Sequence, residues 1–335
     1  ARDGSAKHAL IGSVRRSADQ VRVNATLFDS ETGRNLWSRG YNRQSASLSD
    51  LGRDIAANVT SVLPNINRID QRDASTRPVH FPDPEAYDLL LPGTIRFSRF
   101  TPQMFSVAGD FYRRSMEIDP EYARPAANLA YVLALTVAYG WSNSPKEDLK
   151  AAEQLVRTAL QLDPSTYQAY IAKGLLLRSQ RRHAEAISSF EKAIEISPNS
   201  ADAYSITALT YVFAGQAEKA LSAINNAMKR NPNHPFYYLF TYGTVLFQLE
   251  RYGDALKALE STIKKNPDFI PARLVLASAY AKLGRVSDAE WEYQEVLARI
   301  PDFSLLKEQA RVPYSNTNDL VRYMDGLRTA AGAER

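Results

Sequence analysis

The short stretch Gly12-Ser13-Val14-Arg15-Arg16 has residue types that suit phosphate binding. A glycine-containing turn can bring backbone N–H groups close to an anion, and arginine adds a planar donor that matches phosphate geometry. The same five residues also fit a strand with an exposed basic edge. We favour the strand, because polar and apolar residues alternate through the segment that follows.

Motifs of catalysis and metal binding are absent from the sequence. The chain has no cysteine, and its four histidines lie far apart, at His8, His80, His183 and His234. The patterns HExxH, GxGxxG, GxxxxGK[ST] and GxSxG do not occur. We therefore expect no catalytic residue, no metal and no cofactor, and the lack of cysteine favours a cytoplasmic location.

Charge and hydropathy exclude two further classes of protein. The formal net charge is +4 and the pI about 9.0, which is too mild an imbalance to indicate nucleic-acid binding. No apolar run approaches the roughly 18 to 20 residues that a membrane-spanning helix needs. We expect neither nucleic acid nor a membrane span in this chain.

Prolines recur at a nearly constant interval through most of the chain. The successive spacings are 44, 34, 34, 35 and 34 residues, from Pro120 through Pro164, Pro198, Pro232 and Pro267 to Pro301. Similar text stands before each, as in ALQLDP, AIEISP and VLARIP. A period of 34 residues that ends in this way resembles the tetratricopeptide repeat, a helix–turn–helix unit.

Residue sizes also follow the pattern of this repeat. In the best copy, residues 167–200, Gly174 and Ala186 stand where small side chains let the two helices of a hairpin approach, and Phe190 stands where a large one fills the gap. Four copies agree in this way. The sequence therefore predicts a mainly α fold, a solenoid of about six helical hairpins.

The ends of the array are less regular. Residues 84–120 and 121–164 are expected to form degenerate hairpins, and Pro92-Gly93 predicts a kink or break in the first helix. Helices near 303–310 and 317–330, the second capped by Asn316 or Thr317, should close the apolar end of the stack. We assign residues 85–302 to the repeats, and residues 303–335 to capping helices and a tail.

A small α+β piece is predicted before the repeats. Apolar and polar residues alternate in QVRVNATLF, and turns on either side give a three-stranded antiparallel meander. An amphipathic helix follows, from Ser47 to Pro64. We assign this piece to residues 1–63 and a polar linker to residues 64–84. The free edge of the sheet, near Leu10 to Val14, is expected to be covered by a partner strand, a second copy or the solenoid.

The text GSVRRSADQVRVNATLFDSETGRNLWSRGYNR resembles the second half of a TolB-like α/β domain. AYDLLLPGTIRFSRF and NDLVRYMDGLRTAAG resemble segments that accompany tetratricopeptide repeats in the same proteins. This order of parts is similar to the C-terminal regions of bacterial, especially rhizobial, class III adenylate or guanylate cyclases. Pro92 departs from the pattern, which usually has arginine there. The resemblance implies a piece of a longer protein whose cyclase domain lies outside this chain.

The resemblance also implies a concave groove lined by the first helix of each hairpin. In this groove we place Ile171, Leu175, Arg178, Leu209, Phe213, Tyr237, Phe240, Thr244, Phe247, Leu274 and Lys282. The Lys, Asn and Arg residues with which chaperone-binding relatives hold a terminal carboxylate are missing at the matching positions. An apolar, aromatic groove for a protein or peptide remains, and the alternative is that these rings pack against their own neighbours.

We therefore expect a non-catalytic regulatory and interaction region, attached to an adenylate cyclase. The partner would be a protein, a peptide or a second copy of the chain. Two alternatives are the interaction half of a winged-helix transcriptional regulator and a stand-alone scaffold.

Overall fold

The computed structural model describes residues 8–17, 20–30, 32–44, 51, 54–55, 58–59, 80 and 82–332. The chain divides into two compact units, one up to Asp83 and one from Pro84 onward. Among the described residues, no helix is long and apolar enough to cross a membrane.

The first unit contains the predicted meander. Strands β1 (His8–Ser17), β2 (Gln20–Asp29) and β3 (Asn35–Gln44) pair antiparallel in the order β1-β2-β3. On one face of β2 the apolar side chains are buried, and Leu51 of the following helical segment packs against Val21, Val23 and Tyr41. The remainder of the predicted helix and most of the predicted linker lie outside the described residues.

The pairing of β1 decides between the two interpretations of residues 12–16, a phosphate-binding turn and a strand. These residues pair with β2 in continuous register, Gly12 opposite Ala25 and Arg15 opposite Arg22, so the strand interpretation is confirmed and the phosphate-binding turn is wrong. No described residue pairs with the outer edge of β1. On the face that β2 buries, Leu10 and Val14 are 51% and 67% exposed.

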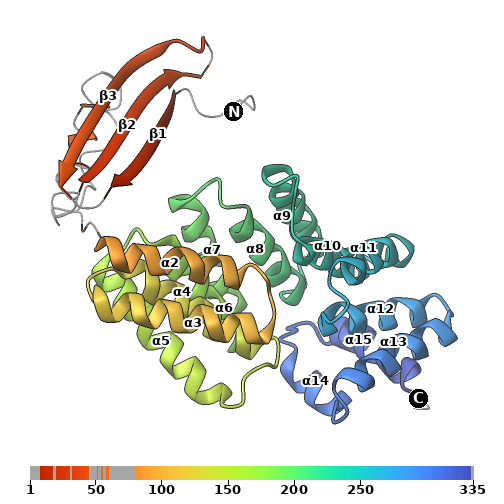
Figure 1. The fold of residues 1–335 in the computed structure, drawn as a ribbon. Coiled ribbons are helices and arrows are strands. Elements are labelled where there is room, and N and C mark those ends of the chain that lie inside the picture. The colour runs from red at the N-terminus through yellow and green to blue at the C-terminus, as the bar shows by residue number, and fades with distance from the viewer. Residues whose placement is uncertain are drawn as a thin grey trace. The chain divides into compact units, whose positions relative to one another are not determined.

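The second unit is built from helical hairpins, as the sequence predicts (Figure 1). The first helices of the six hairpins are α2 (Pro84–Phe97), α4 (Ala123–Ala138), α6 (Tyr167–Ser179), α8 (Ala201–Phe213), α10 (Phe236–Gln248) and α12 (Ile270–Lys282). Their partners are α3 (Pro102–Ile118), α5 (Pro145–Leu162), α7 (His183–Ile196), α9 (Ala217–Arg230), α11 (Tyr252–Lys265) and α13 (Val286–Arg299). Two further helices follow, α14 (Leu305–Arg311) and α15 (Thr317–Ala330). Figure 1 shows the hairpins stacked in chain order, from α2 in orange to α13 in blue.

Close contact within each hairpin explains the small residues of the repeat. A Cβ atom on Gly174 would lie 2.5 Å from Cε1 of Phe190, whose ring is fully buried between α6 and α7. The same relation joins Gly243 of α10 to Leu259 of α11, at 2.7 Å. Because glycine has no side chain, the two helices of the hairpin can lie close together, and the large side chain on the second helix fills the space beside the glycine.

Of the kink or break expected at Pro92, the break is wrong, because α2 runs through it from Pro84 to Phe97. The kink stays a prediction. Proline removes one helical N–H bond, but packing on α3 supports the helix on both sides. Leu90 is buried, the Ser115 hydroxyl donates to the carbonyl of Ala86 at 2.7 Å, and Gly93 lies against Tyr112 with no room for a side chain.

Candidate functional site

Aromatic side chains connect the first hairpin with the fifth and sixth. Phe100, in the turn between α2 and α3, stacks on Tyr237 with ring centroids 5.0 Å apart and meets Phe236 and Phe269 edge-on at 5.6 and 5.9 Å. These partners lie at the beginnings of α10 and α12, more than a hundred residues later in the chain. The solenoid therefore curls until side chains of its first hairpin touch those of its fifth and sixth, a contact that we call the aromatic closure.

A carboxylate anchors two tyrosines at this closure. The hydroxyls of Tyr237 and Tyr238 both donate to Oδ1 of Asp202, at 3.0 and 2.8 Å. Burial raises the pKa of both tyrosines well above its ordinary value, and the Asp202 charge raises it further. Both phenols are therefore protonated donors at any physiological pH.

The C-terminal residues 305–330, which we call the strap, cross the ends of the hairpins. Three hydrogen bonds to backbone carbonyls join it to distant elements. The Arg311 guanidinium donates to the carbonyl of Ala138, the Arg181 guanidinium donates to the carbonyl of Tyr314 at 2.8 Å, and the backbone N–H of Ser315 donates to the carbonyl of Phe213 at 2.8 Å. The strap thus reaches from α4 past α6 and α8, and its last helix, α15, packs on α12 and α13.

The turns between the two helices of each hairpin share one backbone geometry, and two of them hold the strap through a side chain. All six hairpin turns place a residue in the left-handed region, with φ from 53° to 73°: Phe100, Gly140, Arg181, Gly215, Glu250 and Gly284. This conformation costs a residue with a side chain roughly 1–2 kcal/mol. Two of the three non-glycine residues hold the strap: Arg181 donates to the backbone at Tyr314 and Ala310, and Glu250 forms an ion pair of 2.9 Å with Arg322. The third, Phe100, packs on Tyr237 and its neighbours instead.

Between the inner helices and the strap lies a cavity of about 230 Å³. Six of the predicted groove residues line it: Leu175, Arg178, Leu209, Phe213, Phe240 and Thr244. The strap supplies the facing wall, with Glu308, Arg311, Val312, Pro313, Tyr314 and Tyr323. The Tyr314 ring packs edge-on against Phe213, with centroids 5.0 Å apart.

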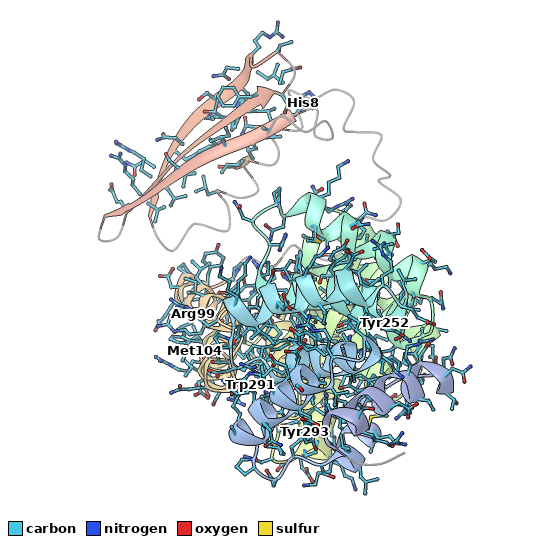
Figure 2. The ribbon with its side chains drawn as sticks, turned by 90° about the vertical axis from the view of Figure 1, so that its right-hand side faces the viewer. His8, Arg99, Met104, Tyr252, Trp291 and Tyr293 are labelled. Carbon is cyan, nitrogen blue, oxygen red and sulfur yellow. The ribbon has the colours of Figure 1, made fainter. Side chains whose placement is uncertain are left out.

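The other five predicted groove residues lie elsewhere. Ile171 and Leu274 are buried, and each lines a different, separate pocket. Tyr237 stacks on Phe100 in the aromatic closure. Phe247 is fully buried and packs on Tyr252, which Figure 2 labels; the centroids are 5.4 Å apart. Lys282, at the end of α12, is half-buried. Their role in partner binding stays a prediction, since most of the eleven side chains are buried in the free chain.

Sequence reasoning missed the strap residues of the site. It predicted α14 and α15, and the structure confirms Asn316 as the N-cap of α15, accepting from the N–H of Asn318 at 2.8 Å. It treated both helices as a terminal cap alone. The apolar residues Val312 and Tyr314 in the short connection were the available signal, because a solvent-exposed linker rarely carries them together.

We expect Gly326→Leu to loosen the strap. A Cβ at Gly326 would lie 2.7 Å from Cα of Ser278, so α15 has to move away from the α12 backbone, at a cost of about 1–3 kcal/mol. Limited trypsin digestion should then cleave faster after Arg311. The matched control is Gly253→Leu in α11, where a Cβ meets nothing within 4 Å. Equal cleavage of the two variants would contradict the tight contact.

In the part of the chain that the structure describes, no group of three or more His, Cys, Asp or Glu residues could hold a metal ion.

Comparisons with known proteins agree with the repeat. Tetratricopeptide repeat profiles match residues 146–201 and 246–309, and the profile described as "Anaphase-promoting complex, cyclosome, subunit 3" matches residues 179–262. A Rhizobium meliloti (strain 1021) protein named "Putative adenylate cyclase 3" is 31% identical over 191 residues, which is 55% of this chain. The chain spans only 31% of the length of that relative.

Solved structures show similarity in fold. The "APC/C hetero-tetramer Cut9-Hcn1" aligns with a TM-score of 0.51 at 14% identity, over 68% of this chain and 46% of that one. The pilus biogenesis factor PilW aligns with a TM-score of 0.45 at 18% identity, over 62% of this chain and 90% of that one. With its 34-residue period, its matched profiles and its six stacked hairpins, the helical part of this chain is a tetratricopeptide-repeat solenoid, an architecture whose concave surface serves as an interaction scaffold.

Proposed function

We propose that this chain is a non-catalytic regulatory and protein–protein interaction region of a bacterial signalling protein, most specifically of an adenylate cyclase. The observation that carries the proposal is the solenoid together with the similarity to a protein named as an adenylate cyclase. The chain covers 31% of that relative, which leaves room there for a separate catalytic domain. On the resemblance of its text, we assign the three-stranded unit to a TolB-like domain.

The strap suggests how a partner would act on such a region. Six predicted groove residues face the strap across the cavity, so a protein, a peptide or a second copy reaches them only when the strap moves. Binding and strap release are then coupled, and the free energy that holds the strap is subtracted from the affinity of the partner. A partner that binds the open form shifts the population toward it.

Cyclic AMP formation tests the proposal. Residues 1–335 incubated with ATP and Mg²⁺ should form none, and robust conversion would overturn the non-catalytic assignment. In the whole protein, Gly326→Leu should change the rate of cyclic AMP formation, whereas Gly253→Leu should not. A gene that encodes a winged helix in place of a cyclase domain would assign this chain to a transcriptional regulator.

A further inference from the structure

The cavity under the strap contains an arginine that lacks an anionic partner. Arg178, in the last turn of α6, is 5% exposed and lines the cavity. Its hydrogen bond within the described residues runs from Nη1 to Oγ1 of Thr210, at a long 3.4 Å, and its guanidinium carbon lies 5.6 Å from the centroid of the Phe213 ring. A guanidinium has five N–H donors, so most of its hydrogen-bonding capacity is unused.

The other charges of the cavity neutralise one another. Arg311 donates to both oxygens of Glu308, at 2.9 and 2.7 Å, and the Tyr323 hydroxyl donates to the same carboxylate at 2.8 Å. Burial raises the pKa of Tyr139, Tyr314 and Tyr323, so these phenols stay uncharged. One positive charge, that of Arg178, is left without a counter-charge among the described lining residues.

An unpaired buried charge is costly, and proteins normally bury a charge only with a partner. Burial lowers the pKa of Arg178, but arginine keeps its proton at physiological pH. The cost would be relieved by an anion that enters the cavity. Replacing Arg178 by an uncharged residue would also remove this cost.

Size and polarity define the rest of such a ligand. Apolar side chains form the remaining wall, including Val137, Leu175, Leu209, Phe240 and Val275. A cavity of 150 Å³ with such a lining holds benzene, so about 230 Å³ accommodates on the order of ten non-hydrogen atoms.

We propose that this cavity binds a small monocarboxylate with an apolar or aromatic body, held by a bidentate pair between its carboxylate and Arg178. The guanidinium fork matches the carboxylate geometry, and a single charge balances a single charge. A dianion such as phosphate fits less well, because Glu308 lies in the same wall. The inference does not depend on the proposed interaction function, since it uses the cavity alone.

The ligand would also act on the strap. Val312 and Tyr314 form part of the wall, so a bound molecule adds contacts between the strap and the inner helices. A ligand that binds only the closed form stabilises that form by mass action.

Isothermal titration calorimetry of the full chain with benzoate, phenylacetate and octanoate tests the proposal. At least one of these carboxylates should bind saturably and raise the melting temperature, and its neutral amide should bind roughly tenfold more weakly or worse. Arg178→Met should abolish the preference for the carboxylate without lowering the melting temperature of the free protein. Arg113→Met, which changes an exposed arginine on α3, should leave binding unchanged.

A second variant tests the cavity without touching the charge. Val275→Phe fills the space that the ligand body needs and should weaken all three probes. The proposal is overturned if no probe binds saturably at millimolar concentration. It is equally overturned if Arg178→Met binds the carboxylate as tightly as the wild type, or if Arg178→Met fails to fold, since the arginine would then be a structural residue with a native partner.

Discussion

Replacing Phe247 by alanine should lower the free energy of unfolding by about 3–5 kcal/mol. The ring is fully buried between α10 and α11, so its removal loses both the transfer free energy of the side chain and the contacts around the resulting cavity. Chemical denaturation followed by circular dichroism measures the change.

Phe240→Ala should cost less than Phe247→Ala. Its ring meets Phe269 edge-on at 5.1 Å but also borders the existing cavity, so fewer contacts surround it. The comparison separates a binding groove from a core. In the double variant Phe240→Ala with Phe247→Ala, unchanged stability together with loss of partner capture would support a binding groove. A large fall in its melting temperature would support packing of the two rings against their own neighbours.

Trp291 provides the matched control for these substitutions. It is an aromatic residue on α13 that is 66% exposed, and Figure 2 labels it. Trp291→Ala should change stability by no more than about 0.5 kcal/mol, because surface substitutions without special contacts rarely exceed that. A Phe247→Ala variant as stable as Trp291→Ala would show that the Phe247 ring is not a core residue.

Replacing Arg273 by methionine should also cost about 3–5 kcal/mol, because it leaves the Glu292 carboxylate, whose side chain is only 12% exposed, without its partner. Arg273 of α12 is 5% exposed, and its Nη1 lies 2.6 Å from Oε2 of Glu292 on α13. It also donates to the carbonyl of Pro267 and pairs with Glu295 at 3.3 Å. Arg178→Met removes an equally buried arginine that has no carboxylate partner, and should cost little.

The loss of unfolding free energy caused by Arg273→Met should become smaller as the pH falls from 7 toward about 4. Burial raises the pKa of Glu292, and Arg273 counteracts this, so loss of the arginine raises that pKa further. A carboxyl with a raised pKa in the folded state contributes stability at low pH that is lost as the pH rises through that pKa. Protonation at low pH therefore relieves the unpaired charge.

Denaturation midpoints measured at several pH values test this expectation. The double variant Arg273→Met with Glu292→Gln should recover most of the lost stability at pH 7, because no unpaired charge then remains at position 292. It should also lose most of the pH-dependent recovery. A deficit of Arg273→Met that is constant with pH would contradict the charge explanation and point to lost packing instead.

The repeat and the meander could be predicted because both depend on local pattern. A proline every 34 residues and paired small and large residues such as Gly174 and Phe190 occur within one hairpin. Alternation in β2 likewise fixes which face is buried. The break predicted at Pro92 was wrong because tertiary packing on α3 outweighed a local signal.

The candidate site could be predicted only in part. The resemblance to the tetratricopeptide repeat suggested eleven inward-facing positions, and six of them line the cavity. The missing half of the cavity comes from the strap, whose contacts join residues far apart in the chain: Arg311 meets Ala138 across 173 positions and Arg181 meets Tyr314 across 133.

By itself, the sequence determined the period, the helices and the faces that they bury, since these follow from interactions within a few turns of the chain. Only the tertiary structure decided that the solenoid closes on itself, that its own C-terminal residues cover the inner helices, and that Arg178 stays without a carboxylate. The physical reason is that a side chain's burial and charge balance depend on which distant element arrives beside it, and no local periodicity records that.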